Sequence, residues 1–253
     1  MNKSTIAAQL FTLRNFTQTA EDLAQTLKKV KDMGYQAVQV SAIGKIDPAT
    51  VKAMADDNGL KICITHTAYN RIVGDTENVI KEHKLWDCEY IGLGSMPTEF
   101  RSGKDGYISF AKEMSKYARI LKDNGLKFAY HNHKFEFQKF DGVTGLEILF
   151  NESDPDVFGF ELDTCWVQAG GADPVDWIYK VKGRMGVVHF KDLAIIDNEQ
   201  MTAEIGEGNL SWGPIIKACR ETGVEWYAIE QDRCLRDPFE SLAISLKYLH
   251  QHV

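Results

Sequence analysis

Four successive apolar segments in the second half of the chain each end in side chains that bind divalent metal ions. The segments are KFAYHNHKFEF, GFELDTCW, GVVHFKD and EWYAIEQD, and the side chains are those of His131, His133, Glu136, Asp163, His189, Asp192, Glu230 and Asp232. A carboxylate or imidazole at the end of a buried strand is costly to desolvate unless a charged partner compensates. Four such ends in sequence order indicate one shared partner, and a divalent cation with three or four nitrogen and oxygen ligands fits best.

The sequence around these residues alternates between strand-like and helix-like patterns. Strands are predicted over residues 5–10, 37–41, 61–66, 89–94, 126–133, 158–163, 185–191 and 225–231, and helices over 19–33, 48–58, 75–85, 106–124, 144–151, 174–182, 212–222 and 238–251. Glycines that suit a left-handed residue end several helical patterns, and Asp-Pro pairs that suit a capped first turn begin others. Eight strand–helix units in 253 residues match a (β/α)8 barrel of about 250 residues.

The main alternative fold is an open, doubly wound parallel sheet. Its usual glycine-rich phosphate turn is missing after the first strand, TIAAQLFTLR. Neighbouring strands lie about 4.8 Å apart, so the first and last of four strands in an open sheet lie roughly 14 Å apart, too far to share one ion. In a closed barrel the strand ends converge at the C-terminal rim, where this fold carries its chemistry. The sequence therefore favours the α/β class with a single (β/α)8 TIM barrel.

Composition limits the domain organisation and the partners. The chain is 44% hydrophobic and 26% charged throughout, with no linker or low-complexity segment, so we expect one catalytic domain over residues 1–253. A formal charge of −7 argues against a nucleic-acid partner, because phosphate binding needs a basic face. No apolar run approaches 18 residues, which argues against a membrane partner.

The cellular location and assembly are less constrained by the sequence. The first residues, MNKSTIAAQLFTLRNF, lack the apolar stretch of a signal peptide. Five scattered cysteines are odd in number and lack metal-type spacing, which indicates reduced thiols. We therefore expect a cytoplasmic protein, and the sequence leaves open whether it forms a homo-oligomer.

Several of these segments resemble a known family. QLFTLR, YHNHKFEF, ELDTCWVQAGGADP, VHFKD, GEGNLSW and YAIEQD together resemble the sugar isomerase/epimerase superfamily with a xylose-isomerase-like TIM barrel, over residues 5 to 250. The likeness is to its sugar phosphate isomerase/epimerase and inosose dehydratase branch, and the superfamily also contains the family-2 apurinic endonucleases. The motifs specify the superfamily better than the reaction. The resemblance implies one divalent metal ion, Mn, Co, Mg or Zn, held at the ends of strands five to eight.

The resemblance also assigns metal ligands. Carried over, it places Asp163, His189 and Glu230 in three of the four ligand positions, which relatives often fill with Glu, Asp, His and Glu. Many relatives have Glu where this chain has His131. We expect the fourth ligand to be Glu136, five residues later, and keep His131 as the alternative.

The substrate side of the site is expected to involve His66, Trp166 and Glu207. His66 ends the strand predicted over 61–66, and Trp166 follows Asp163 closely enough to wall the pocket or stack on a sugar. Glu207 lies in GEGNLSW, whose glycines permit close backbone approach to a substrate. Each has a structural alternative: an ordinary loop histidine, a packed tryptophan and a tight turn. Asp163 could likewise only cap the loop that follows it.

The expected chemistry is proton transfer next to a carbonyl group. A divalent ion bridging the oxygens of a keto-sugar stabilises an enediolate, and acid and base groups then move the proton. Glu136 and Glu230 are expected to transfer protons or bind metal, while His131, His133 and Lys191 orient or protonate hydroxyl groups. The leading expectation is a sugar isomerase or epimerase. The second is a dehydratase or lyase acting on an inosose or 3-keto-glycoside.

The substrate is expected to be a small, unphosphorylated carbohydrate. Phosphate sites on barrels use backbone N–H groups after strands seven and eight, and here those positions carry the acids Glu207, Glu230 and Asp232. The sequence disfavours two other function classes. A three-zinc DNA-repair endonuclease needs a histidine where this chain has Trp166, and a non-catalytic sugar-binding barrel would not need a metal flanked by acids.

Overall fold

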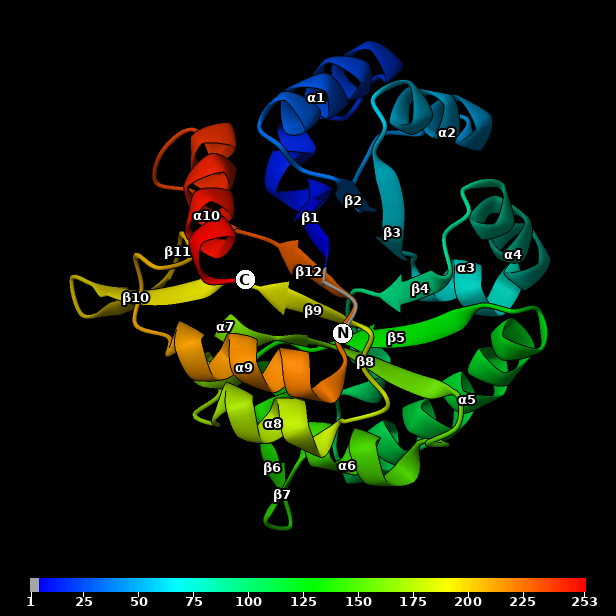
Figure 1. The fold of residues 1–253 in the computed structure, drawn as a ribbon. Coiled ribbons are helices and arrows are strands. Elements are labelled where there is room, and N and C mark those ends of the chain that lie inside the picture. Colours follow the sequence, from blue (N-terminus) through cyan, green and yellow to red (C-terminus); the bar gives the residue numbers. More distant parts are fainter. Residues whose placement is uncertain (1–4) are drawn as a thin grey trace.

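A closed ring of eight parallel strands forms the centre of the computed structural model, which describes residues 5–253 (Figure 1). The ring order is β1-β12-β9-β8-β5-β4-β3-β2. The strands are β1 (Thr5–Gln9), β2 (Ala37–Val40), β3 (Lys61–His66), β4 (Tyr90–Leu93), β5 (Lys127–His131), β8 (Phe158–Asp163), β9 (Val187–Phe190) and β12 (Trp226–Ile229). All eight predicted strands are present, and parallel pairing of β1 with β12 closes the barrel.

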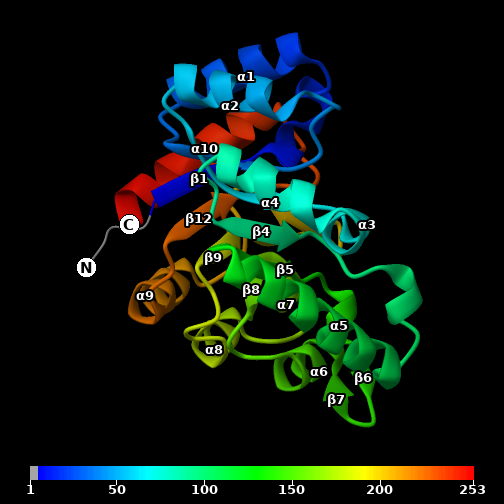
Figure 2. The same ribbon diagram turned by 90° about the vertical axis from the view of Figure 1, so that its right-hand side faces the viewer.

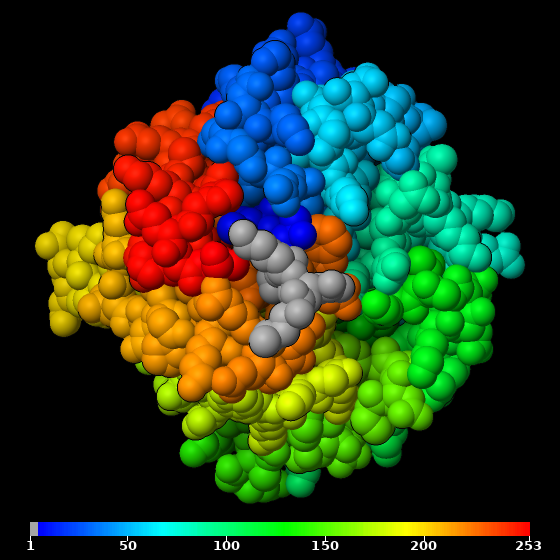
Figure 3. Space-filling model, viewed as in Figure 1, coloured from blue at the N-terminus to red at the C-terminus, as the bar shows by residue number. Residues whose placement is uncertain are grey.

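Eight helices surround the barrel, each following one of its strands. They are α1 (Ala20–Asp32), α2 (Pro48–Asp57), α4 (Thr76–Leu85), α5 (Lys104–Asp123), α6 (Gly145–Glu152), α8 (Pro174–Lys180), α9 (Trp212–Thr222) and α10 (Pro238–His252). The segments follow one another around the barrel until α10 lies beside α1 (Figure 3). Among residues 5–253, no helix combines the length and apolar character that a membrane span requires.

Local signals explain where the helices begin and end. The side chains of Asp47, Asp173 and Asp237 each accept a hydrogen bond from a backbone N–H of the first turn, immediately before a proline at the first helical position. Gly223 ends α9 in the left-handed conformation, with φ of +82°. These caps explain why most of the predicted helix boundaries lie within two residues of the observed ones.

The barrel interior has an apolar layer and a polar layer. Because side chains alternate along a strand, residues two apart face the same side. An apolar inward residue is followed two positions later by a polar one on most strands, in the pairs Ala7 and Gln9, Ala37 and Gln39, Ile64 and His66, Ala129 and His131, and Val187 and His189. The apolar layer fills the N-terminal half of the barrel, so the polar side chains gather at the C-terminal end.

The elements that sequence patterns did not predict all follow a strand at that C-terminal end. They are η1 (Leu10–Phe16), α3 (Tyr69–Gly74), η2 (Thr98–Phe100), η3 (Phe135–Phe137), the hairpin of β6 (Lys139–Phe140) and β7 (Val143–Thr144), α7 (Thr164–Ala169), and the hairpin of β10 (Asp192–Ile196) and β11 (Glu199–Ala203). Figure 2 shows α3 and the β6–β7 hairpin at the end of the molecule opposite the C-terminus. The loops around the polar layer are therefore the ones that carry additional short helices and hairpins.

Candidate metal centre

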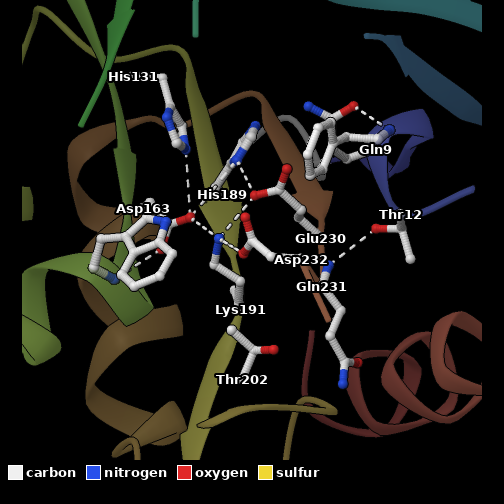
Figure 4. Close-up of polar contacts among 12 residues, drawn as sticks. Gln9, Thr12, His131, Asp163, His189, Lys191, Thr202, Glu230, Gln231 and Asp232 are labelled. Atoms are coloured by element: carbon white, nitrogen blue, oxygen red, sulfur yellow. Dashed lines mark hydrogen bonds and ion pairs between the residues drawn. The ribbon is translucent and has the colours of Figure 1, made fainter. Parts of the chain in front are cut away.

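Four buried side chains from four neighbouring strands converge at the C-terminal end of the barrel. They belong to His131 at the end of β5, Asp163 at the end of β8, His189 in β9 and Glu230 just after β12. Each offers one ligand atom, and these atoms all lie within 4.8 Å of one another. Figure 4 shows the four side chains turned toward a common space. The structure thus brings together Asp163, His189 and Glu230, as the sequence predicted.

The hydrogen bonds of the two imidazoles leave one nitrogen of each facing the carboxylates. His131 Nδ1 lies 3.1 Å from the carbonyl oxygen of Gly94, which can only accept, so Nδ1 carries the hydrogen. His189 Nε2 lies 2.7 Å from Gln39 Oε1 and 3.0 Å from a carboxylate oxygen of Glu161, so Nε2 carries the hydrogen there. Metal-binding histidines characteristically donate their outer N–H to a carbonyl or carboxylate in this way.

The inner nitrogens then face acceptors at short range. His131 Nε2 is 3.4 Å from Asp163 Oδ2, and His189 Nδ1 is 3.2 Å from Glu230 Oε2. A lone pair directed at a carboxylate is repulsive unless a proton or a metal ion lies between them. Two imidazole nitrogens and two carboxylate oxygens are a donor set that suits Zn, Mn or Co. The four residues therefore fit a divalent ion.

The charges of the site also favour a bound cation. Burial lowers the pKa of His189, but Glu161 and Glu230 outweigh it and raise that pKa to about 10. The buried Lys191 ammonium lies 2.7 Å from Asp163 Oδ2 and 2.9 Å from Glu230 Oε2, and it also contacts Asp232. These carboxylates outweigh burial and raise the pKa of Lys191 well above its usual value. Excess negative charge thus holds a proton on His189, and a bound metal ion would displace that proton.

The structure does not bring Glu136, the fourth ligand expected from the sequence, into this group. Glu136 Oε1 accepts a hydrogen bond of 2.6 Å from the Tyr130 hydroxyl, and Oε2 accepts one of 2.9 Å from the backbone N–H of His133. Tyr130 packs among the core side chains outside the barrel, whereas the next residue, His131, faces inward. The η3 turn carries Glu136 to the Tyr130 side of the strand, and His131 occupies the position in the group.

His133 and Trp166 lie beside the four-residue group. The ring centroids of His133 and His131 are 4.8 Å apart, and those of His133 and Trp166 are 6.0 Å apart. Lys191 Nζ lies 4.7 Å from the centroid of the Trp166 ring. Burial, with nearby His131 and Lys191, lowers the pKa of His133 to about 2, so its imidazole is neutral. Trp166 is therefore placed where it could wall the site, and His133 lies between it and His131.

His66 lies next to the group, and both of its ring nitrogens contact polar side chains of the barrel interior. Its ring stacks on His189 with a centroid distance of 5.3 Å. His66 Nε2 donates to Glu161 Oε2 over 2.8 Å, and Nδ1 lies 3.5 Å from Gln9 Nε2. These contacts place His66 in the polar layer of the barrel, and the substrate-binding role expected from the sequence stays a prediction.

Glu207 is not brought to the group either. Its carboxylate is exposed and pairs with Arg236 over 3.0 Å. The GEGNLSW loop instead wraps around the buried Asp192, which accepts hydrogen bonds from the backbone N–H groups of Gly206 and Gly208. A Cβ at position 208 would lie 2.3 Å from Asp192 Oδ1, so the glycine is needed for this close approach. The tight-turn alternative therefore describes this loop better than direct substrate contact.

Glu161 and Gln39 are site residues that the sequence patterns did not identify. Glu161 is fully buried. Burial raises its pKa, but His189 and His66 outweigh burial and lower that pKa below its usual value. The signal was present, because Glu161 lies two residues before Asp163 on one strand and must face the same side. Gln39 is related in the same way to the inward-facing Ala37.

Comparisons with known proteins agree with this architecture. The model of the family of xylose isomerase-like TIM barrels matches residues 27–252. An inosose dehydratase of Geobacillus kaustophilus is 22% identical over 90% of this chain and 87% of its own length. A crystal structure of a sugar phosphate isomerase/epimerase from Parabacteroides distasonis superposes with a TM-score of 0.81 at 24% identity, covering 98% of both chains.

A second similar structure contains a metal ion. The IOLI protein with a bound zinc atom superposes with a TM-score of 0.72 at 13% identity, covering 98% of both chains. At these identities the superposed structures establish the fold alone. The residues matched by the family model include every strand of the ring except β1, and all four residues of the candidate centre.

Proposed function

Because the chain belongs to the family of xylose isomerase-like TIM barrels, we propose that it is a metal-dependent enzyme acting on a small keto-carbohydrate. The observation that carries this proposal is the group of His131, Asp163, His189 and Glu230, in which both imidazoles have their outer N–H anchored. Those four residues would hold one divalent ion, Mn, Co, Mg or Zn. When bound, the ion supplies Lewis acidity that stabilises negative charge on the oxygen of a carbonyl group.

The residues around the group have the chemistry for removing a proton from carbon. Glu230 is buried, and burial, which raises its pKa, is outweighed by Lys191 and His189, so it is ionised. Its carboxylate is the base that we assign to the carbon next to the carbonyl. The Lys191 ammonium is held between carboxylates, where its charge balances negative charge that develops on the substrate.

The gathering of the acids around one lysine favours a lyase. Asp163, Glu230 and Asp232 all contact Lys191, and the imidazoles of His131 and His133 lie beside them. Elimination needs one base: Glu230 takes the proton from carbon, the C–O bond at the next carbon breaks, and the same carboxyl returns the proton to the oxygen, which departs as water or an alcohol. The inosose dehydratase relative supports this reaction class. We therefore propose elimination from an inosose or a 3-keto-glycoside.

Isomerisation or epimerisation is the second candidate. It requires a second group that exchanges a proton with carbon, and His133 lies next to His131, although its lowered pKa makes it a weak base. Both candidates share the first step, abstraction of a proton next to a carbonyl.

The charges of the rim support an unphosphorylated substrate. Lys191 is engaged by three carboxylates, and Arg236 is paired with Glu207. Neither cation is left to bind a phosphate group. The substrate that we propose is therefore a neutral, polyhydroxylated ketone.

Incubation of metal-loaded protein with ketoses, inososes and 3-keto-glucosides in deuterated water tests the proposal. NMR should detect, for one substrate class, an unsaturated ketone with release of water or an alcohol. A product that keeps every oxygen and gains deuterium would support the second candidate instead. Absence of both elimination and deuterium exchange across the three classes, with metal bound, would contradict the proposal. The Asp163→Asn variant provides the metal-deficient control.

A further inference from the structure

A second buried cluster lies beside the four-residue group and shares His189 with it. His66, Glu161 and His189 also offer ligand-type atoms within 4.8 Å of one another. Glu161 Oε2 is 2.8 Å from His66 Nε2, and Glu161 Oε1 is 3.0 Å from His189 Nε2. The composition alone is that of a second metal site.

The hydrogen bonds argue against a second ion. His189 Nε2 faces the oxygens of Gln39 and Glu161, so it carries a hydrogen and has no lone pair for a metal. His66 Nδ1 faces the amide nitrogen of Gln9, which can only donate, so the hydrogen of His66 is on Nε2. Both imidazole nitrogens that face Glu161 are therefore donors. A metal ion would have to displace both hydrogens and the contact with Gln39.

The geometry points to Glu161 as a positioning residue that orients His189 for a metal ion held by the four-residue group, an inference that rests on the proposed function. Its carboxylate and Gln39 keep the hydrogen of His189 on Nε2, and Nδ1 is thereby presented to the space shared with Asp163 and Glu230. Glu161 and Asp163 face inward from the same strand, two residues apart. Asp163 is one of the four residues of the group, and Glu161 contacts His189, which is another of them.

Glu161 acts mainly through its charge. The N–H of His189 is directed at Gln39, and Glu161 Oε1 has no aligned hydrogen-bond donor among residues 5–253. A fully buried carboxylate 3.0 Å from the imidazole makes that imidazole more basic and therefore a stronger metal ligand. The corresponding anchor of His131 is the uncharged carbonyl of Gly94. The two histidines are therefore supported unequally, and His189 depends on an ionised residue.

Calorimetric titration of metal-free protein with Mn²⁺ tests this role. Wild type should bind one ion per chain, and Glu161→Gln, which removes the charge but little volume, should still bind one ion with affinity about 10- to 100-fold weaker. Glu161→Asp, which keeps the charge, should bind more tightly than Glu161→Gln. The matched control is Glu204→Gln, a buried carboxylate that contacts Ser241 and Arg236 rather than the four-residue group.

A Co²⁺ absorption spectrum gives a readout that depends on ligand geometry rather than on turnover. It should change in Glu161→Gln and remain unchanged in Glu204→Gln. Unchanged affinity and spectrum in Glu161→Gln, with one ion bound to wild type, would overturn the positioning role and leave the proposed function standing. Two ions in wild type, whether or not Glu161→Gln folds, would make Glu161 a ligand of a second ion. No ion in wild type would overturn both proposals.

Discussion

At the scale of single residues, the C-terminal end of the barrel interior holds more negative than positive charge. Glu161, Asp163 and Glu230 are at most 5% exposed, and Lys191 is the buried lysine that opposes them. Unpaired buried charges cost several kcal/mol each, so the native state needs a further positive charge nearby. Protonated His189 supplies that charge in the absence of metal, and a divalent ion would supply it more fully. Binding of metal and stability of the fold are therefore coupled.

The choice between His131 and Glu136 as fourth ligand can be tested by two substitutions. His131→Ala removes an imidazole that faces Asp163, so we expect metal affinity to fall by at least about 100-fold, beyond the loss typical of an outer contact. Glu136→Gln alters a carboxylate bonded to Tyr130 and His133, so metal content should stay at the wild-type level. Metal analysis after dialysis measures both. Loss of metal in Glu136→Gln with retention in His131→Ala would reverse the assignment.

Glu136 should instead affect how stability depends on pH. Burial raises its pKa to about 8, from a usual value of 4.5, despite the hydrogen bonds from Tyr130 and His133. Between these values the unfolded chain releases the proton and the folded chain keeps it. The free energy of unfolding should therefore fall as pH rises from about 5 to 8, by up to about 1.4 kcal/mol per pH unit from this group.

Urea unfolding of metal-free protein over this pH range checks the prediction. Glu136→Gln has no proton to release, so its slope with pH should be shallower than that of wild type, whatever its stability at a single pH. Equal slopes in the two proteins would show that Glu136 is ionised in the folded state.

At the scale of elements, the loop between β11 and α9 depends on Asp192. This fully buried carboxylate accepts hydrogen bonds from the backbone N–H groups of Leu193, Gly206, Gly208 and Leu210, and from the indole N–H of Trp212. One side chain thus ties the β10–β11 hairpin to the start of α9. The loop is shaped by its interior acid, and the exposed Glu207 adds only a pair with Arg236.

Substitution of Asp192 should be strongly destabilising. In Asp192→Asn an amide NH₂ would face N–H donors on one side, and each buried donor left unpaired costs about 1–3 kcal/mol. We expect a loss of about 2–5 kcal/mol in the free energy of unfolding, measured by chemical denaturation. Asp197→Asn at the exposed tip of the same hairpin is the matched control and should change stability little, because Asn tolerates the positive φ of 50° there. Equal effects of the two substitutions would contradict the role of Asp192.

The elements were predictable from sequence to different degrees for physical reasons. Buried strands of a parallel barrel are apolar runs, and Asp-Pro starts and glycine ends are local signals, so the ring and its helices could be predicted. The position of Glu136 was harder to predict, because it depends on which side of β5 the η3 turn carries the chain, and that is set by packing of Tyr130. Glu161 is predictable from its spacing of two residues to Asp163, because alternation along a strand places both side chains on one face.

At the scale of the whole molecule, metal should stabilise the barrel because four of its strands contribute ligands. An ion at about 100 times its dissociation constant adds about 2.7 kcal/mol. For a chain of this size that corresponds to a rise in Tm of roughly 5–10 °C. Asp163→Asn keeps a cap for α7 but loses one charged ligand, so its Tm should not respond to metal. Scanning calorimetry with EDTA and with Zn²⁺ measures the difference. An equal rise in both proteins would place the stabilising ion elsewhere.

The most direct test of the account is the position of the metal ion. Anomalous difference maps from crystals grown with Mn²⁺ or Zn²⁺ should contain one peak among His131 Nε2, Asp163 Oδ2, His189 Nδ1 and Glu230 Oε2, about 2.0–2.2 Å from each. A peak bound by Glu136, a peak between His66 and Glu161, or no peak at the end of the barrel would contradict it.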